Sequence, residues 1–407
     1  MPADRYGPVV TLADTADPRL DSGRSWMMVG VAFASTFTVF GVAYSFGAFF
    51  EEMSAEFDTG RGLTALLFSL TTFLYFVLGM YTGRWSDRTG PTPVLVTGAV
   101  SLGTGLLLTS LAPNIWFGLA AYSAGVGIAV ACCYVPVVSV VGGWFEHHRT
   151  AALGVAVAGI GTGTLVMAPV ASIVIDEVGW RSAYRLFGVV GAAILLLCAL
   201  VAERPPVHAE VPPPARLQEL VTIPSFRLLY GSAFLMSVAL FVPFVFLADY
   251  AEDQGLSSGL AAALVGFIGG SSIIGRLALG AVAGRVGLVR LYQGCFFVMG
   301  IAFVIWLVAG DNVALLVTFT VVLGVSYGGF IALSPAVAAD AFGTAGLGGV
   351  LGALYTSAGV GGLIGPPLAG AIIDETGRYG PAITMATLLT FAAFAVLLGL
   401  RTDRSDA

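Results

Sequence analysis

The chain has 407 residues, of which 57% are apolar and only 10% are charged, and its mean hydropathy is +0.92. A soluble domain carries roughly 25% charged residues, so this composition excludes an ordinary soluble protein and predicts the lipid bilayer as the solvent. The formal net charge is −6, and we expect no nucleic-acid partner.

The N-terminal segment, residues 1–26, carries charges on both sides of Pro18. It has no apolar h-region before Trp26, so it is not a secretory signal peptide. We expect this segment to be a cytosolic tail.

Twelve apolar runs follow this tail. Each has about 19–28 residues, which is enough for a helix to cross a hydrocarbon core of about 30 Å. They lie near residues 27–50, 62–82, 94–112, 115–137, 151–175, 183–201, 228–248, 260–284, 289–309, 313–339, 346–373 and 381–400. We therefore predict an all-α integral membrane protein with 12 transmembrane helices.

Residues 202–226 are rich in proline and charge, and they divide the runs six and six. We expect this segment to be a cytosolic linker between two six-helix halves, residues 27–201 and 227–400. A short cytosolic tail at 401–407 would end the chain.

The two halves also resemble each other in sequence. Residues 154–179 align with residues 352–377 at a constant offset of 198, with Gly, Pro, Asp and Glu positions in common. An even number of helices separates the two copies, so the halves have the same topology. This predicts a pseudo-symmetry axis along the membrane normal.

All 18 basic residues are arginines, and the chain contains no lysine. If the N-terminus is cytosolic, thirteen of these arginines lie on the cytosolic side of the membrane and four lie on the outer side, with one remaining. This is the positive-inside bias of a membrane protein. We therefore expect both termini in the cytoplasm. Arginine without lysine, together with much Ala and Gly, is typical of a GC-rich bacterial genome, so we expect the inner membrane of a bacterium.

Arg276 is the remaining arginine, in the middle of an uncharged run from about residue 260 to 284. It lies nine positions before Arg285, hence about 13 Å from the membrane boundary, where a charge costs roughly 2.5–3.5 kcal/mol. Every Asp and Glu maps to a tail, a loop or a helix end, so no carboxylate is available at this depth.

Two accounts of Arg276 are open. It could bond a free backbone carbonyl in a seam of small residues, or its counter-ion could be an anionic substrate. We favour the substrate, because a guanidinium offers two parallel N–H donors that fit a carboxylate.

Other polar side chains are expected around the same cavity. Ser272 lies one helical turn before Arg276 and shares its face. Tyr75 lies 201 positions before Arg276, at the equivalent place in the first half. Tyrosine hydroxyls can donate to a carboxylate. The predicted substrate site is completed by tyrosines on other helices expected to line the cavity: Tyr44, Tyr134, Tyr327 and Tyr355.

The loop GRWSDRTGP at 83–91 resembles the motif that the major facilitator superfamily has between its second and third helices. The resemblance implies a twelve-helix carrier whose site lies near the midplane between the halves. It also implies a gating role for Asp87, which would face Arg84 or Arg88 and tie the halves together in one state. The alternative is a turn whose charges only set the topology. The last motif position, ordinarily basic, is Pro91 here.

Two further stretches resemble monocarboxylate transporters and their bacterial oxalate and formate relatives: WFEHHRTAALGVAVAG at 144–159 and GGLIGPPLAGAIIDETGRYGPA at 361–382. The resemblance implies a substrate-binding arginine at the place of Arg276. Many eukaryotic members have Asp four residues before that arginine, where this chain has Ser272, so their Asp-based proton coupling is not expected. The second cation of an oxalate exchanger is also absent, with Tyr355 nearby.

These observations predict a secondary active transporter of a small monocarboxylate such as lactate or pyruvate, because one cationic centre suits one carboxylate better than two. Transport would proceed by alternating access, coupled to protons or to exchange of another anion. The alternatives are an oxalate or formate-type antiporter, a lipophilic drug efflux carrier and a non-transporting anion sensor. We expect a monomer, with no metal, no cofactor and no enzyme activity.

Overall fold

The computed structural model describes residues 20–206, 220–343 and 347–400, and the regular structure in these ranges is helical. Most of the expected linker and nearly all of both tails lie outside the described residues. The helices in chain order are α1 (Gly23–Tyr44), α2 (Phe46–Glu56), α3 (Arg61–Thr89), α4 (Pro91–Ser110), α5 (Ile115–Cys133), α6 (Val135–Gly143), α7 (Arg149–Val201), α9 (Pro224–Leu240), α10 (Val242–Asp253), α11 (Ser258–Val286), α12 (Leu288–Ala309), α13 (Val313–Phe342), α14 (Leu347–Thr376) and α15 (Tyr379–Leu397).

Within the described ranges, eleven apolar helical stretches are long enough to cross a membrane. The stretch of 51 residues at 151–201 would be about 77 Å long as one helix, more than twice the hydrocarbon core. Gly179 divides it with a φ of 75° and a ψ of 157°, a conformation that glycine adopts without steric clash. The described chain thus makes twelve crossings, and the predicted all-α membrane architecture is confirmed.

Three of these crossings are interrupted. α1 passes into α2 at Ser45, α5 into α6 at Tyr134, and α9 into α10 at Phe241. α6 and α10 each carry a proline in their first two positions, Pro136 and Pro243, which lacks the N–H that would continue the preceding helix. Interrupted transmembrane helices often flank a binding site at mid-depth.

The first helix begins at Gly23, inside the segment expected to be a tail. Ser22 and Ser25 form a capping box, in which each side chain accepts from the backbone N–H of the other. The hydropathy pattern places the boundary at Trp26 because the residues that cap a helix are polar and do not contribute to it.

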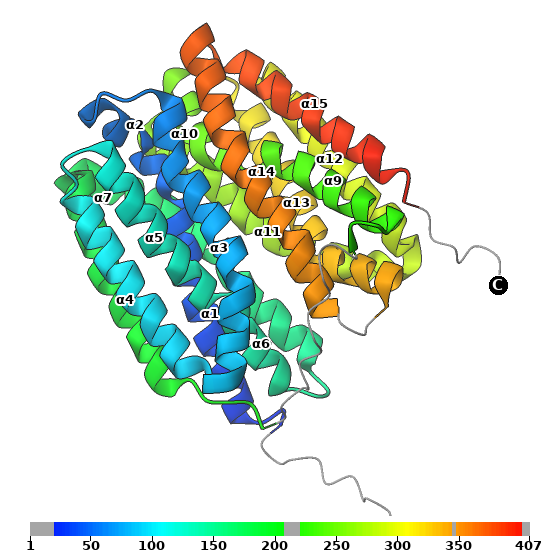
Figure 1. Ribbon diagram of the computed structural model, residues 1–407. Coiled ribbons are helices and arrows are strands. Elements are labelled where there is room, and N and C mark those ends of the chain that lie inside the picture. The colour runs from blue at the N-terminus through cyan, green and yellow to red at the C-terminus, as the bar shows by residue number, and fades with distance from the viewer. Residues whose placement is uncertain (1–19, 207–219, 344–346, 401–407) are drawn as a thin grey trace, which may run out of the picture.

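The helices form two groups, α1–α7 and α9–α15, which lie side by side (Figure 1). Across the interface, α3 packs along α14 and α7 packs along α11. Glycines permit the close approach: a Cβ at Gly161 on α7 would lie only 2.5 Å from the carbonyl oxygen of Gly269 on α11. Small residues of this kind let helix backbones approach closely in membranes.

Polar contacts join the two halves at one end of the bundle, which we call the Arg61 end. Arg61 at the start of α3 donates from Nε to Asp249 on α10 at 3.1 Å. Ser258 at the start of α11 donates to Asp176 on α7 at 3.2 Å. Both contacts connect the first half with the second, so the halves are fastened at this end.

At the opposite end, which we call the Asp87 end, the polar contacts between described side chains stay within one half or the other. The Asp21 carboxylate accepts hydrogen bonds from the backbone N–H groups of residues 146–148 at 3.0–3.2 Å. These bonds, that from His147 above all, hold the pKa of Asp21 well below its usual value. Arg24 pairs with Glu203 in the same half. The halves are therefore less firmly joined at this end.

Candidate functional site

A cavity lies between the two halves at the level of Arg276. Arg276 is the single charged side chain among the described residues that line it. Six of the seven side chains predicted for a substrate site line this one cavity: Arg276, Tyr44, Tyr75, Tyr134, Tyr327 and Tyr355. The structure thus brings together residues that lie as far apart in sequence as the first and the eleventh crossing.

The guanidinium of Arg276 is only partly satisfied by the protein. Its Nη1 donates to the backbone carbonyl of Val157 on α7 at 2.9 Å. Its Nε is buried and has no hydrogen-bond partner among the described residues. The bond to a backbone carbonyl, which was one of the two accounts of this arginine, is present, but it leaves the positive charge without an anion.

The close contact between glycines of α7 and α11 explains how the Arg276 side chain reaches the first half. Because Gly161 and Gly269 carry no side chains, α7 and α11 come close enough for the arginine on α11 to bond a carbonyl on α7. The helix pair therefore holds the guanidinium at the boundary between the halves. A group placed there contacts both halves and responds to any change in their separation.

Ser272 is not among the residues that line the cavity. Its hydroxyl donates to the carbonyl of Gly269 at 2.7 Å, and the residue is 1% exposed. Its backbone lies so close to α13 that a Cβ at Gly328 would clash with the Ser272 carbonyl oxygen. The expectation that Ser272 shares the cavity face with Arg276 does not hold, because a short side chain that bonds its own helix stays in the seam.

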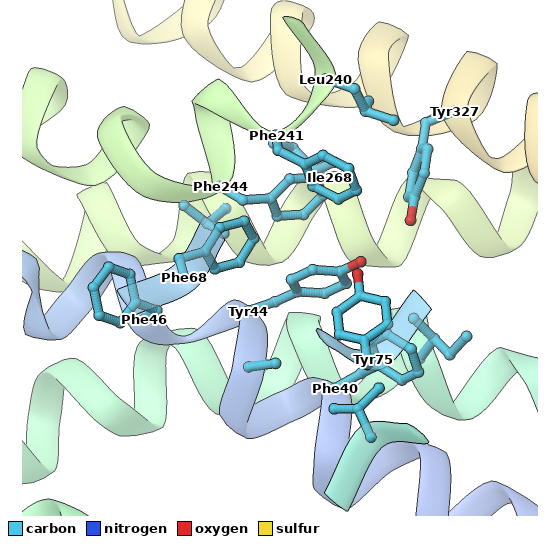
Figure 2. Packing of buried hydrophobic residues seen from close by; sticks show 14 of the residues in the cluster. Phe40, Tyr44, Phe46, Phe68, Tyr75, Leu240, Phe241, Phe244, Ile268 and Tyr327 are labelled. Carbon is cyan, nitrogen blue, oxygen red and sulfur yellow. The ribbon is translucent and has the colours of Figure 1, made fainter. Parts of the chain in front are cut away.

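Three tyrosines converge on the cavity from both halves (Figure 2). The hydroxyls of Tyr44 and Tyr75 lie next to each other, and the hydroxyl of Tyr327 points toward them from the second half. The Tyr75 hydroxyl is buried without a hydrogen-bond partner among the described residues. An unpartnered buried hydroxyl is disfavoured unless a ligand or water completes it.

Tyr134 and Tyr355 occupy other parts of the wall. Tyr134 stands at the junction of α5 and α6, and its ring meets Phe40 edge-on at 5.1 Å. The ring of Tyr355 on α14 lies 6.2 Å from Phe76 on α3, across the boundary between the halves. These aromatic contacts fix the orientation of rings that a bound molecule would touch.

Sequence reasoning missed three polar residues of the cavity, Ser357 on α14 and the neighbouring pair Tyr292 on α12 and Ser334 on α13. The hydroxyl oxygens of Tyr292 and Ser334 lie 3.2 Å apart. Tyr292 lies at the edge of a predicted apolar run, where a tyrosine is typical of the membrane interface. Ser334 directly precedes Pro335, whose repeat equivalent Pro136 belongs to an interrupted helix, and this was the available signal.

An aromatic layer closes the cavity toward the Arg61 end. Tyr44 of the first half stacks on Phe244 of the second half with ring centroids 4.5 Å apart. Phe68 and Phe241 form a second pair between the halves at 6.0 Å, and both residues are buried. Figure 2 shows this layer between the two halves.

The residues that line the cavity nearer the Asp87 end are more exposed to solvent. Ile331 and Ser334 on α13, and Leu351 and Leu354 on α14, are only half-buried, whereas Tyr44 is 3% exposed. The cavity is thus closed toward the Arg61 end and opens toward the Asp87 end.

A partly buried ion pair joins the two halves at the Arg61 end. Arg61 contacts Asp249, which is 5% exposed, and also lies 3.8 Å from Asp253. The hydroxyl of Tyr379 donates to Asp249 and accepts from Arg61. Asp249 is therefore paired within the protein.

Asp87 lies exposed near the end of α3. Among the described residues it forms no ion pair, and the predicted contact with Arg84 or Arg88 is not made. Arg88 uses its backbone carbonyl to accept from Arg204 at 3.1 Å. The gating role predicted for Asp87 therefore rests on no contact in the described residues.

The sequence profile of the Major Facilitator Superfamily matches residues 31–311 and 229–407. Monocarboxylate transporter 12-B of Danio rerio is 28% identical over 437 residues, which cover 95% of this chain and 90% of that protein. Monocarboxylate transporter 3 of Rattus norvegicus is 30% identical over 379 residues, with 88% and 76% covered.

Among solved structures, a bacterial homologue of the human lysosomal transporter Spinster, in an inward-facing and occupied conformation, is similar with a TM-score of 0.70. The two chains share 16% identity over 92% of this chain and 94% of the other, so this likeness concerns the fold alone. The profile match and the relative at 30% identity show that the chain is a multi-pass membrane protein that belongs to the major facilitator superfamily, with monocarboxylate transporters among its relatives.

Proposed function

We propose that the protein is a carrier, not an enzyme, that moves a small monocarboxylate across a membrane by alternating access, with Arg276 as the group that binds the carboxylate. The observation that carries the proposal is the state of Arg276: a half-buried cation with a buried, unpartnered Nε in a cavity that contains no carboxylate among its described residues. A buried charge is strongly disfavoured unless it is paired. A substrate carboxylate supplies the pair.

The opposite wall supports the same ligand. The Tyr75 hydroxyl, in the first half, also lacks a partner, and that of Tyr327 points toward it. One carboxylate has about four lone-pair sites, so it can accept from a guanidinium and from hydroxyls together. A bound anion would thus contact both halves, as a substrate must if it is to bias their closure.

We place the Asp87 end in the cytoplasm of a bacterium, following the distribution of arginines, and the Arg61 end outside. In this orientation the closed aromatic layer faces outward and the cavity opens inward. The described structure is then the inward-facing member of the transport cycle. Asp87 would find its partners in the other member, when the cytoplasmic end closes.

We propose that the substrate itself is the proton or counter-charge carrier. No Asp or Glu lines the cavity in the described residues, so no acid there can titrate with substrate binding. The loaded site is neutral, whereas the empty one leaves Arg276 uncompensated. Exchange of one anion for another should therefore be faster than net uptake, and net uptake should rise with an inward proton gradient.

The single cation also argues against an oxalate-type exchanger, because a second carboxylate would find no cationic partner in the described cavity. A lipophilic drug efflux carrier would not need Arg276. A non-transporting sensor would bind the anion without moving it.

The test is flux of labelled pyruvate in proteoliposomes, with Arg276→Lys compared with the matched variant Arg285→Lys, an exposed arginine nine positions later on the same helix. We expect Arg276→Lys to lower exchange at least tenfold, because a point ammonium does not reproduce the planar fork, and Arg285→Lys to retain it. Normal exchange by Arg276→Lys would contradict the proposed role of the arginine. Exchange no faster than net uptake would contradict the proposed coupling.

A further inference from the structure

We infer that this cavity selects monocarboxylates with a bulky apolar body, a branched aliphatic chain or an aromatic ring, over lactate and pyruvate. The inference rests on the proposed function, and it names the part of the substrate that Arg276 does not touch.

Most of the side chains that line the cavity beyond the carboxylate-binding groups are apolar. Arg276 lines the cavity, and the hydroxyls of Tyr44, Tyr75 and Tyr327 converge on it (Figure 2). The remaining lining is largely aliphatic and aromatic, with Leu351, Leu354 and Ala358 from α14 and further side chains from α9 and α13. The polar groups there are hydroxyls, and two of them, on Tyr292 and Ser334, lie 3.2 Å apart. A carboxylate held by Arg276 therefore directs the rest of the molecule to walls that are mainly apolar and uncharged.

A second charge on the substrate has no place in this cavity. None of the lining residues in the described chain other than Arg276 is charged. A second carboxylate would lose its hydration without a second cation to pair with, and an ammonium group would lie near the fixed charge of Arg276 without an anion to pair with. The cavity therefore discriminates against dicarboxylates and against amino acids.

The size of the preference follows from the apolar contact. Each methylene moved from water to an apolar surface strengthens binding by roughly fourfold, equivalent to about 0.8 kcal/mol. Lactate and pyruvate offer one methyl group beyond the functional carbons, and they also carry a polar oxygen. A ligand such as 3-methylbutanoate or phenylacetate offers several apolar carbons, so its affinity should exceed that of acetate by tens of fold.

The experiment is a titration of the purified full-length protein in detergent with acetate, lactate, 3-methylbutanoate, phenylacetate, succinate and phenylalanine. The dissociation constant is taken from the ligand-dependent rise in melting temperature. Binding is measured because hydrophobic acids cross lipid unaided in their neutral form. We expect 3-methylbutanoate and phenylacetate to bind at least tenfold more tightly than acetate. Succinate and phenylalanine should bind more weakly than both 3-methylbutanoate and phenylacetate.

Two variants locate the preference in the apolar wall. Ala358→Leu narrows the cavity. It should weaken the binding of phenylacetate at least tenfold, as the loss of two methylene contacts would produce, and change the binding of acetate by no more than about threefold. Leu354→Ala should weaken 3-methylbutanoate selectively, and it serves if the first variant does not fold. Ala392→Leu, an exposed position on α15, is the matched control and should change neither ligand.

Equal affinity for acetate and phenylacetate, succinate binding as tight as phenylacetate, or equal loss of both ligands in Ala358→Leu would overturn the inference. These results differ from a failure of the proposed function. In that case no carboxylate in the series would bind, or binding would survive Arg276→Lys unchanged.

Discussion

Two arginines lie at the boundary between the halves, and they are satisfied in opposite ways. Arg61 contacts Asp249, Asp253 and the hydroxyl of Tyr379. Arg276 has one bond to a backbone carbonyl and a buried Nε without a partner among the described residues. The first arginine is completed by the protein, and the second leaves donors free for a ligand.

The difference separates the two tasks of a carrier. At the Arg61 end an anion of the protein closes the interface, and in the proposed cycle this contact would break and re-form once. At the cavity the described residues supply no anion, so in the proposed function the charge is balanced only when substrate is bound. In the proposed function, an anion of the protein beside Arg276 would compete with the substrate. Without an anion beside Arg61, the two halves would lose the ion pair that joins them at that end.

The largest predicted effect on the folded state comes from Arg61→Gln, which leaves Asp249 buried and unpaired. Breaking a buried pair costs about 3–5 kcal/mol, but a third of the Arg61 side chain is exposed, so we expect about 1–3 kcal/mol for the described state. The measurement is the melting temperature of purified protein. Arg378→Gln, an exposed arginine near the same end, is the control and should change it little. An unchanged melting temperature in Arg61→Gln would show that the ion pair does not fasten this end.

The next effect concerns the free hydroxyl of the cavity. Tyr75→Phe should weaken carboxylate binding by roughly threefold to tenfold, the equivalent of one hydrogen bond of about 0.5–1.5 kcal/mol. Tyr122 is the matched control, because its hydroxyl is also buried and unpartnered among the described residues but lies outside the cavity. Tyr122→Phe should leave the dissociation constant unchanged. Equal effects of the two substitutions would show that Tyr75 acts through the fold and not through the ligand.

The smallest predicted effect lies at the Asp87 end. Asp87 forms no ion pair among the described residues, so Asp87→Asn should leave substrate affinity within about threefold and slow turnover severalfold, through the equilibrium between states. Exchange rates and dissociation constants measured on the same preparation test this, with the exposed Asp311→Asn as control. Loss of affinity with normal turnover would place Asp87 in the binding site instead.

The sequence predicts the crossings well, because a membrane helix must satisfy its own backbone and its length is set by the bilayer. The repeat also predicts one cross-boundary relation: Tyr75, 201 positions before Arg276, lines the same cavity from the other half. Both predictions depend on periods and lengths, which a single sequence displays directly.

The other features of the site depend on contacts that neither helical spacing nor the internal repeat predicts. The bond of Ser272 to its own helix is a choice of side-chain rotamer, and helical spacing does not determine it. The pairing of Arg61 with Asp249 joins residues 188 positions apart. Tyr292 enters the cavity because α12 and α13 pack together there, whereas its position in the chain is typical of the membrane interface.

The central claim is that the missing partner of Arg276 is the carboxylate of the substrate. The direct measurement is the rise in melting temperature that phenylacetate or pyruvate produces in the wild-type protein, in Arg276→Gln and in Arg61→Gln. We predict a rise in the wild type and in Arg61→Gln, because a ligand that binds the folded state stabilises it by mass action, and no rise in Arg276→Gln. A carboxylate-dependent rise that persists undiminished in Arg276→Gln would contradict the account.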